Sequence, residues 1–177
     1  MPRTILIVED TDLCRDSLEV ALMGLAETGL AELGSSGLGT SELRVRAVET
    51  AEQALAILDQ EDVCALITDL HLASRSYAPH ANAQDGFDLI AALRSSPRYT
   101  ALPVIVTSGD TDPGTAARLA SLGVKDYFSK PYSPGAVRSR LEQLIRKSEG
   151  MIAENSLDAV DHQIETETEA TGGLPSA

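Results

Sequence analysis

The chain has 177 residues, 43% of them hydrophobic, and a formal net charge of −13. This length and apolar fraction are enough for one packed domain with appendages. The negative charge excludes nucleic-acid binding through a general basic surface, and no apolar run is long enough to cross a membrane. The N-terminus lacks a secretory signal, and Cys14 and Cys64 fit reduced thiols. We therefore expect a cytoplasmic protein whose partners are cations or other proteins.

Five strands are predicted before residue 148. The segment Leu43–Val48 alternates apolar and polar residues, as a half-exposed edge strand does. Val63–Asp69 is apolar until its last residue, as a strand buried on both faces is. The full set of predicted strands is Thr4–Asp10, Leu43–Val48, Val63–Asp69, Pro103–Ser108 and Val124–Phe128.

Capping signals and apolar spacing predict five helices between and after these strands. Thr50 and Gln53 have the spacing of a capping box, and Asp112 and Ser133 are each followed by a proline, as N-caps often are. The other two helices follow from the helical spacing of Leu18, Leu22 and Leu25 and from the segment Gly86–Arg94. Strands that alternate with helices predict an α/β domain whose parallel sheet is covered on both faces.

The last thirty residues differ in kind from the rest. Residues 148–177 carry seven acids and no Lys or Arg, so they hold more than half of the net charge of −13. Such a segment has too little apolar surface to offset the entropy of ordering it. We expect residues 1–147 to form the domain and residues 148–177 to be an acidic disordered tail.

Polar residues stand at the ends of four predicted strands. They are Glu9 and Asp10 on the first, Asp69 on the third, Thr107 and Ser108 on the fourth, and Lys130 after the fifth. Each alone is an ordinary turn residue. Together they predict a site, because ligands of open parallel sheets bind beyond the carboxyl ends of the strands.

The chemistry of this set points to phosphate. Three carboxylates repel one another unless a cation lies between them, and oxygen ligands suit Mg²⁺, with Mn²⁺ as a substitute. Lys130 and Ser108 supply a charge and a donor for phosphoryl oxygens. A carboxylate can itself take up the phosphoryl group as an acyl phosphate. The pattern predicts Mg²⁺-assisted phosphorylation of an aspartate.

The segments "VED", "LITDL", "PVIVTSG" and "YFSKP" closely resemble the receiver domain of two-component response regulators, over residues 4–147. The resemblance implies a flavodoxin-like, doubly wound, five-stranded parallel sheet of order 2-1-3-4-5 with five helices. It implies a cytoplasmic phosphoprotein, phosphorylated by a histidine kinase or a phosphotransfer protein. Such a protein is no dedicated enzyme, since it accepts a phosphoryl group and hydrolyses only its own aspartyl phosphate.

The resemblance also assigns roles to individual residues. It makes Asp69 the phosphoacceptor, Lys130 the phosphate contact, Ser108 the switch hydroxyl and Tyr127 the switch aromatic. Thr107 is the alternative switch, but its offset from Lys130 is poorer. The implied metal ligands are Glu9, Asp10, Asp69 and the backbone carbonyl of His71, with Asp10 binding directly. The family also implies a cis bond before Pro131.

Two further positions of the family concern the lifetime of the phosphoryl group. They lie two residues beyond the phosphoacceptor and beyond the switch hydroxyl, here His71 and Asp110. An acidic Asp110 is suited to hold the attacking water, whereas a bulky His71 is suited to exclude it. We expect His71 to dominate and hydrolysis to be slow; a His71 that simply faces solvent is the other interpretation.

Two insertions depart from the family's pattern. Gly86 follows Asp69 at an offset of seventeen residues, with the extra residues at 73–84, where receivers have a tight turn. That segment is a partner-recognition element, a lid or a tolerated surface loop. The segment 24–42 is also long, and either an extended first helix or a Gly-rich loop would account for it.

No output domain is evident after Lys147, so we expect signalling by protein–protein contact through the fourth helix, fifth strand and fifth helix. The alternative is that the chain is a fragment of a larger regulator.

A degenerate receiver that acts only as an interaction module is the main alternative function, but the intact set of strand-end residues opposes it. A phosphatase of the haloacid-dehalogenase type is a further alternative. It fits poorly, because that family needs a second Asp where this chain has His71 and lacks an acid pair like Glu9 and Asp10.

Overall fold

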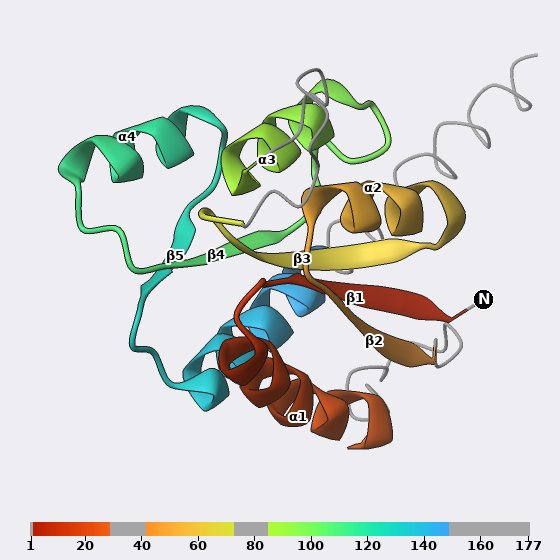
Figure 1. Cartoon of the computed structure of the whole chain (residues 1–177). Coiled ribbons are helices and arrows are strands. Elements are labelled where there is room, and N and C mark those ends of the chain that lie inside the picture. The colour runs from red at the N-terminus through yellow and green to blue at the C-terminus, as the bar shows by residue number, and fades with distance from the viewer. Residues whose placement is uncertain (1, 29–41, 73–84, 149–177) are drawn as a thin grey trace, which may run out of the picture.

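The computed structural model describes residues 2–28, 42–72 and 85–148. Its centre is a five-stranded, all-parallel sheet in the order β2-β1-β3-β4-β5, as predicted (Figure 1). The half-polar strand β2 lies at one edge and β5 at the other. The strands are β1 (Arg3–Val8), β2 (Leu43–Val48), β3 (Val63–Asp69), β4 (Val104–Ser108) and β5 (Asp126–Ser129).

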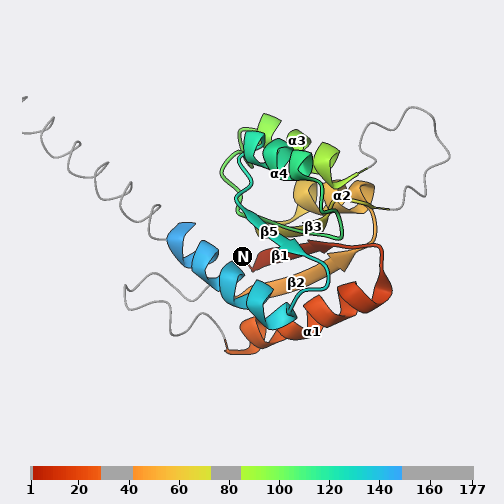
Figure 2. The same cartoon turned by 90° about the vertical axis from the view of Figure 1, so that its left-hand side faces the viewer.

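Helices cover both faces of the sheet. In Figures 1 and 2, α1 and the last helix lie on one face, whereas α2, α3 and α4 lie on the other. The buried side chains divide in the same way into two clusters, one on each face of the sheet. The helices are α1 (Asp12–Thr28), α2 (Ala51–Gln60), α3 (Gly86–Ser95), α4 (Pro113–Ser121) and a last helix at residues 134–148. None of the helices in these described ranges is long and apolar enough to cross a membrane.

The helix starts follow local capping chemistry. Thr50 and Gln53 form the predicted capping box of α2, and Asp112 caps α4 with its side chain accepting from the N–H of Gly114. Asp85, which the sequence analysis did not single out, caps α3 by accepting from the N–H of Asp88. This cap fixes where α3 starts, directly after the segment 73–84.

The boundaries of two strands were wrong by a few residues. β1 ends at Val8 because the side chain of Glu9 accepts the N–H of Thr11 at 3.2 Å and starts a turn. β5 begins at Asp126, because Val124 closes the end of α4 with a hydrogen bond to the carbonyl of Leu119. Both differences leave the strand-end side chains at the same edge of the sheet.

The predictions about insertions and tail fall mostly outside the described residues. The helix α1 continues to Thr28, so the segment 24–42 begins as helix. Residues 29–41, the insertion 73–84 and the tail from 149 onward lie beyond what the structure describes.

A glycine allows α3 to approach the end of β3. A Cβ atom built on Gly86 would lie 2.0 Å from the carbonyl oxygen of Asp69 and 2.9 Å from the Cα of Leu70. The N–H of Gly86 donates to the carbonyl of Leu70 at 2.9 Å. Only a residue without a side chain fits this contact, and it fixes the backbone that carries Asp69.

Candidate functional site

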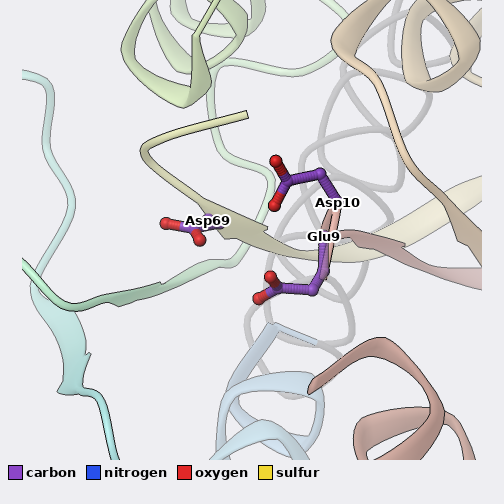
Figure 3. A group of neighbouring side chains, drawn as sticks. All are labelled: Glu9, Asp10 and Asp69. Atoms are coloured by element: carbon purple, nitrogen blue, oxygen red, sulfur yellow. The ribbon is translucent and has the colours of Figure 1, made fainter. Parts of the chain in front are cut away.

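Three carboxylates meet at the carboxyl edge of the sheet. Ligand atoms of Glu9, Asp10 and Asp69 all lie within 4.8 Å of one another (Figure 3). Glu9 and Asp10 follow β1, and Asp69 is the last residue of the neighbouring strand β3. The register of these strands, with Val8 opposite Thr68, places Glu9 level with Asp69. This confirms that the predicted acids converge.

Lys130, which directly follows the edge strand β5, forms hydrogen bonds with two of these carboxylates. Its Nζ donates to Asp69 Oδ2 at 2.6 Å and to Glu9 Oε2 and Oε1 at 2.8 and 3.0 Å. Its backbone N–H donates to the carbonyl of Ser108 at 2.8 Å, and its bond to Pro131 is cis, as expected. Burial alone lowers the pKa of Lys130, but the hydrogen bonds to Asp69 and Glu9 more than reverse this and raise it. The ammonium group therefore stays charged.

Glu9 holds Lys130 in place with a buried carboxylate. It is fully buried, and both of its oxygens accept from Lys130. Its backbone carbonyl accepts from Arg15 on α1 at 3.0 Å. Asp10, in contrast, is only partly buried. With Glu9 occupied in this way, Asp10 is the better placed of the pair for direct contact with a cation, which stays a prediction.

Asp69 is held by two donors. Lys130 contacts Oδ2, and the backbone N–H of His71 donates to Oδ1 at 3.1 Å. The side chain is 7% exposed, so it reaches solvent only at the mouth of the site. Three carboxylates and one ammonium leave a formal charge of −2 here. An oxygen-only donor set with this charge fits Mg²⁺.

Ser108 and His71 complete the other side of the site. Ser108 is fully buried, and its Oγ accepts the N–H of Asp110 at 3.1 Å and lies 3.4 Å from Nδ1 of His71. His71 is an exposed residue, yet its ring is turned toward the site. Thr107 lies on the opposite face of β4 by strand alternation, where its buried hydroxyl is beside the phenol of Tyr132. This supports Ser108 as the hydroxyl of the site.

The turn after β4 is tied to both β5 and α4. The hydroxyl of Tyr127 donates to the carbonyl of Asp110. The carboxylate of Asp110 accepts from Thr115 Oγ1 at 2.5 Å and from the N–H of Asp112 at 2.8 Å. The hydrogen bond from Thr115, followed by that from Asp112, lowers the pKa of Asp110. Asp110 thus acts as part of the turn rather than as a side chain aimed at Asp69.

Three residues of the site were missed in the sequence analysis. Arg15 contacts the backbone of Glu9, Thr115 holds Asp110, and Tyr132 is a half-buried neighbour of Glu9. Burial raises the pKa of the Tyr132 phenol to about 12. Of these three, only Arg15 could have been noticed in the sequence, as a basic residue that shortly follows the acid pair Glu9 and Asp10. The contacts of Thr115 and Tyr132 depend on how α4 and the last helix pack against the sheet, which no local sequence pattern predicts.

Comparisons with known proteins agree with this geometry. The family model of the response regulator receiver domain matches residues 26–146. Two-component response regulator ORR13 of Oryza sativa subsp. japonica is 32% identical over 128 residues, covering 72% of this chain and 85% of that protein. The chain therefore belongs to the family of response regulator receiver domains.

Solved structures carry the same fold. A putative response regulator from Chloroflexus aurantiacus J-10-fl matches with a TM-score of 0.60 and 26% identity, over 82% of this chain and 98% of that one. A response regulator receiver protein from Pseudomonas putida matches with a TM-score of 0.58 and 29% identity, over 83% and 98%. The family match begins at residue 26, so the structure adds β1, with Glu9 and Asp10, to the site.

Proposed function

We propose that this receiver domain is a Mg²⁺-dependent phosphoacceptor whose phosphorylated residue is Asp69. The observation that carries the proposal is the contact between Lys130 and Asp69 at 2.6 Å, beside an oxygen-only cluster of three acids. A phosphoryl group on Asp69 would lie next to a fixed cation, and the buried hydroxyl of Ser108 lies nearby. The domain is no dedicated enzyme in this proposal.

The donor is a phosphohistidine of a histidine kinase or phosphotransfer protein. An oxygen of Asp69 attacks phosphorus, the P–N bond breaks, and imidazole leaves as the acyl phosphate forms. Asp10, Asp69 and the backbone carbonyl of His71 would hold the metal ion, which when bound would neutralise charge on the transferring group. Lys130 holds Asp69 in place and balances its charge, and Glu9 holds Lys130. We assign this exchange to the cytoplasm.

The output of the domain is a change in protein–protein contacts around α4, β5 and the last helix. Tyr127 of β5 supports this assignment, since its hydroxyl is bonded to the turn that follows Ser108. Movement of Ser108 would pull on that turn and release Tyr127. A downstream protein target, rather than nucleic acid or membrane, would read the change.

The proposal is tested by labelling with a small phosphodonor. Incubation of the full chain with acetyl phosphate and Mg²⁺ should give an alkali-labile adduct, which should not form when EDTA is present from the start. Asp69→Asn keeps the shape of the side chain and removes the nucleophile, so its labelling should be absent. Asp126→Asn, at an aspartate that pairs with Arg140 away from the site, is the matched control and should label normally. Equal labelling of wild type and Asp69→Asn would exclude Asp69.

A second candidate function is a receiver that binds its partners without phosphorylation. The acid–lysine geometry opposes it, since such a module has no need of a partly buried cation between two buried acids. Absence of any adduct on the wild type, with both acetyl phosphate and a panel of histidine kinases, would favour this second function.

A further inference from the structure

His71 connects the two sides of the site. Its backbone N–H donates to Oδ1 of Asp69 at 3.1 Å, while Nδ1 of its ring lies 3.4 Å from Oγ of Ser108. Among the described residues, no other side chain forms a hydrogen bond with the Ser108 hydroxyl. The ring is thus the one side-chain contact that this hydroxyl makes before any phosphoryl group is present.

The packing around His71 aims its ring at Ser108. Leu70 and Leu72 on either side are buried, with exposed fractions of 1% and 7%. The N–H of Gly86 also donates to the carbonyl of Leu70, which fixes the chain before His71. Buried residues on both sides fix the backbone of His71, which places the start of its side chain within reach of Ser108.

The Ser108 hydroxyl has two partners in this state. Its oxygen accepts the N–H of Asp110, and in the His71 tautomer protonated at Nε2 its own proton is donated to Nδ1. To donate to an oxygen of a phosphoryl group on Asp69, the same proton must leave the ring. Gly109, the next residue, has open space around it, since a Cβ atom there would meet nothing within 4 Å. Gly109 therefore does not block a movement of Ser108 once the contact is given up, and the bonds of Asp110 to Tyr127 and Thr115 are what resists it.

We propose that His71 is a positioning residue that holds Ser108 in its unphosphorylated place and so opposes the switch. This inference rests on the proposed function, because it concerns what the phosphoryl group on Asp69 must displace. The contact stabilises only the unphosphorylated arrangement, so it raises the concentration of phosphoryl mimic needed to move the turn. Its effect passes through Ser108 and not through the phosphoryl group itself.

The test is a titration of the full chain with beryllofluoride and Mg²⁺, followed by the NMR signals of Tyr127. Loss of one hydrogen bond from the starting state should lower the midpoint for His71→Ala by about three- to tenfold. His71→Phe keeps the bulk of the ring without its nitrogen and should shift the midpoint in the same direction. A wild-type midpoint in His71→Phe would show a steric role and overturn the proposal.

A double-mutant comparison separates action through Ser108 from direct action on the phosphoryl group. In a Ser108→Ala background, His71→Ala should leave the midpoint for metal-dependent mimic binding, read by calorimetry, unchanged. An equal shift in both backgrounds would overturn the inference. If wild type neither labels with acetyl phosphate nor binds the mimic, the proposed function itself fails. If wild type does both and His71→Ala has the wild-type midpoint, only the inference fails.

Discussion

The acid–lysine half of the site, Glu9, Asp10, Asp69 and Lys130, is held very differently from the hydroxyl half, Ser108 to Asp110 with His71 and Tyr127. In the first half, Lys130 alone makes three hydrogen bonds to buried carboxylates, and Gly86 packs directly behind Asp69. In the second half, the Ser108 side chain has two longer contacts, and open space surrounds Gly109.

In the proposed function, this difference would let one sheet edge both bind and switch. The proposed phosphotransfer needs Asp69 and the metal ligands of the acid–lysine half in one fixed arrangement, since misplacement by about 1 Å can cost roughly a hundredfold in rate. The proposed switch needs two positions of Ser108, whose two contacts are ones that a hydrogen bond to a phosphoryl group can replace. The predictions below change one half at a time.

The largest effect should come from a substitution at Gly86, with Gly109 as its control. Gly86→Ala forces a Cβ atom against the backbone of Asp69 at 2.0 Å, and we expect a loss of about 3 kcal/mol in the free energy of unfolding. Gly109→Ala, where the space is open, should change stability by less than about 0.5 kcal/mol. Denaturant unfolding of both variants measures this, and equal losses would contradict the difference in packing between the two halves.

Removal of Lys130 should break the acid–lysine half. Lys130→Ala leaves buried Glu9 and Asp69 without their cation, which we expect to cost about 2 kcal/mol, less than for a fully buried pair because the Lys130 side chain is 21% exposed. With one positive charge gone, the site should also bind Mg²⁺ more tightly. Lys125→Ala, an exposed lysine before β5, is the control. Calorimetric Mg²⁺ titration and thermal unfolding check both effects, and unchanged Mg²⁺ affinity would contradict the charge argument.

The two residues expected to tune the phosphoryl lifetime should differ. The ring of His71 lies at the mouth of the site, so His71→Ala should admit water and shorten the lifetime several-fold. The carboxylate of Asp110 is bonded to Thr115 and Asp112, so Asp110→Ala should leave the lifetime equal or longer. The decay of labelled protein after removal of the phosphodonor measures both. An unchanged decay in His71→Ala would mean that the side chain does not cover the site.

Tyr127 should report on the hydroxyl half with a smaller change in stability. Tyr127→Phe loses the hydrogen bond to the carbonyl of Asp110, worth about 1 kcal/mol. Tyr99→Phe loses a similar bond to the carbonyl of Leu58, away from the site, and serves as the control. Both variants should be slightly less stable, but only Tyr127→Phe should lower the beryllofluoride midpoint. If both variants leave that midpoint at the wild-type value, Tyr127 has no part in switching.

The smallest effect should appear only in alkali. Burial raises the pKa of Tyr132 from 10.0 to about 12, so the folded state keeps a proton that the unfolded chain loses. The stability from this group is complete below pH 10 and falls as the pH rises toward 12. Lys130, whose pKa is also raised, acts in the same direction above about pH 10.5. Tyr132→Phe should therefore make the alkaline decline in melting temperature shallower, and an identical decline would exclude Tyr132 as a cause.

The sequence alone determined the strand-end residues and the family, because these depend on local patterns, and the sheet order followed from the resemblance to that family. A strand that is apolar through Thr68 and ends in Asp69 marks a buried strand with its last side chain at the sheet edge. The capping box at Thr50 and the Asp112–Pro113 pair mark helix starts for equally local reasons. Parallel pairing then brings Glu9 level with Asp69 without further information.

Only the tertiary structure decided which side chains of the site contact one another. The contact of His71 with Ser108 depends on the burial of Leu70 and Leu72, and the capture of Asp110 by Thr115 depends on where α4 docks. These contacts join residues on different elements, and sequence spacing does not encode the distance between elements. Packing selects one side-chain direction out of several that the backbone permits, so the contacts of the hydroxyl half could be found only from the tertiary structure.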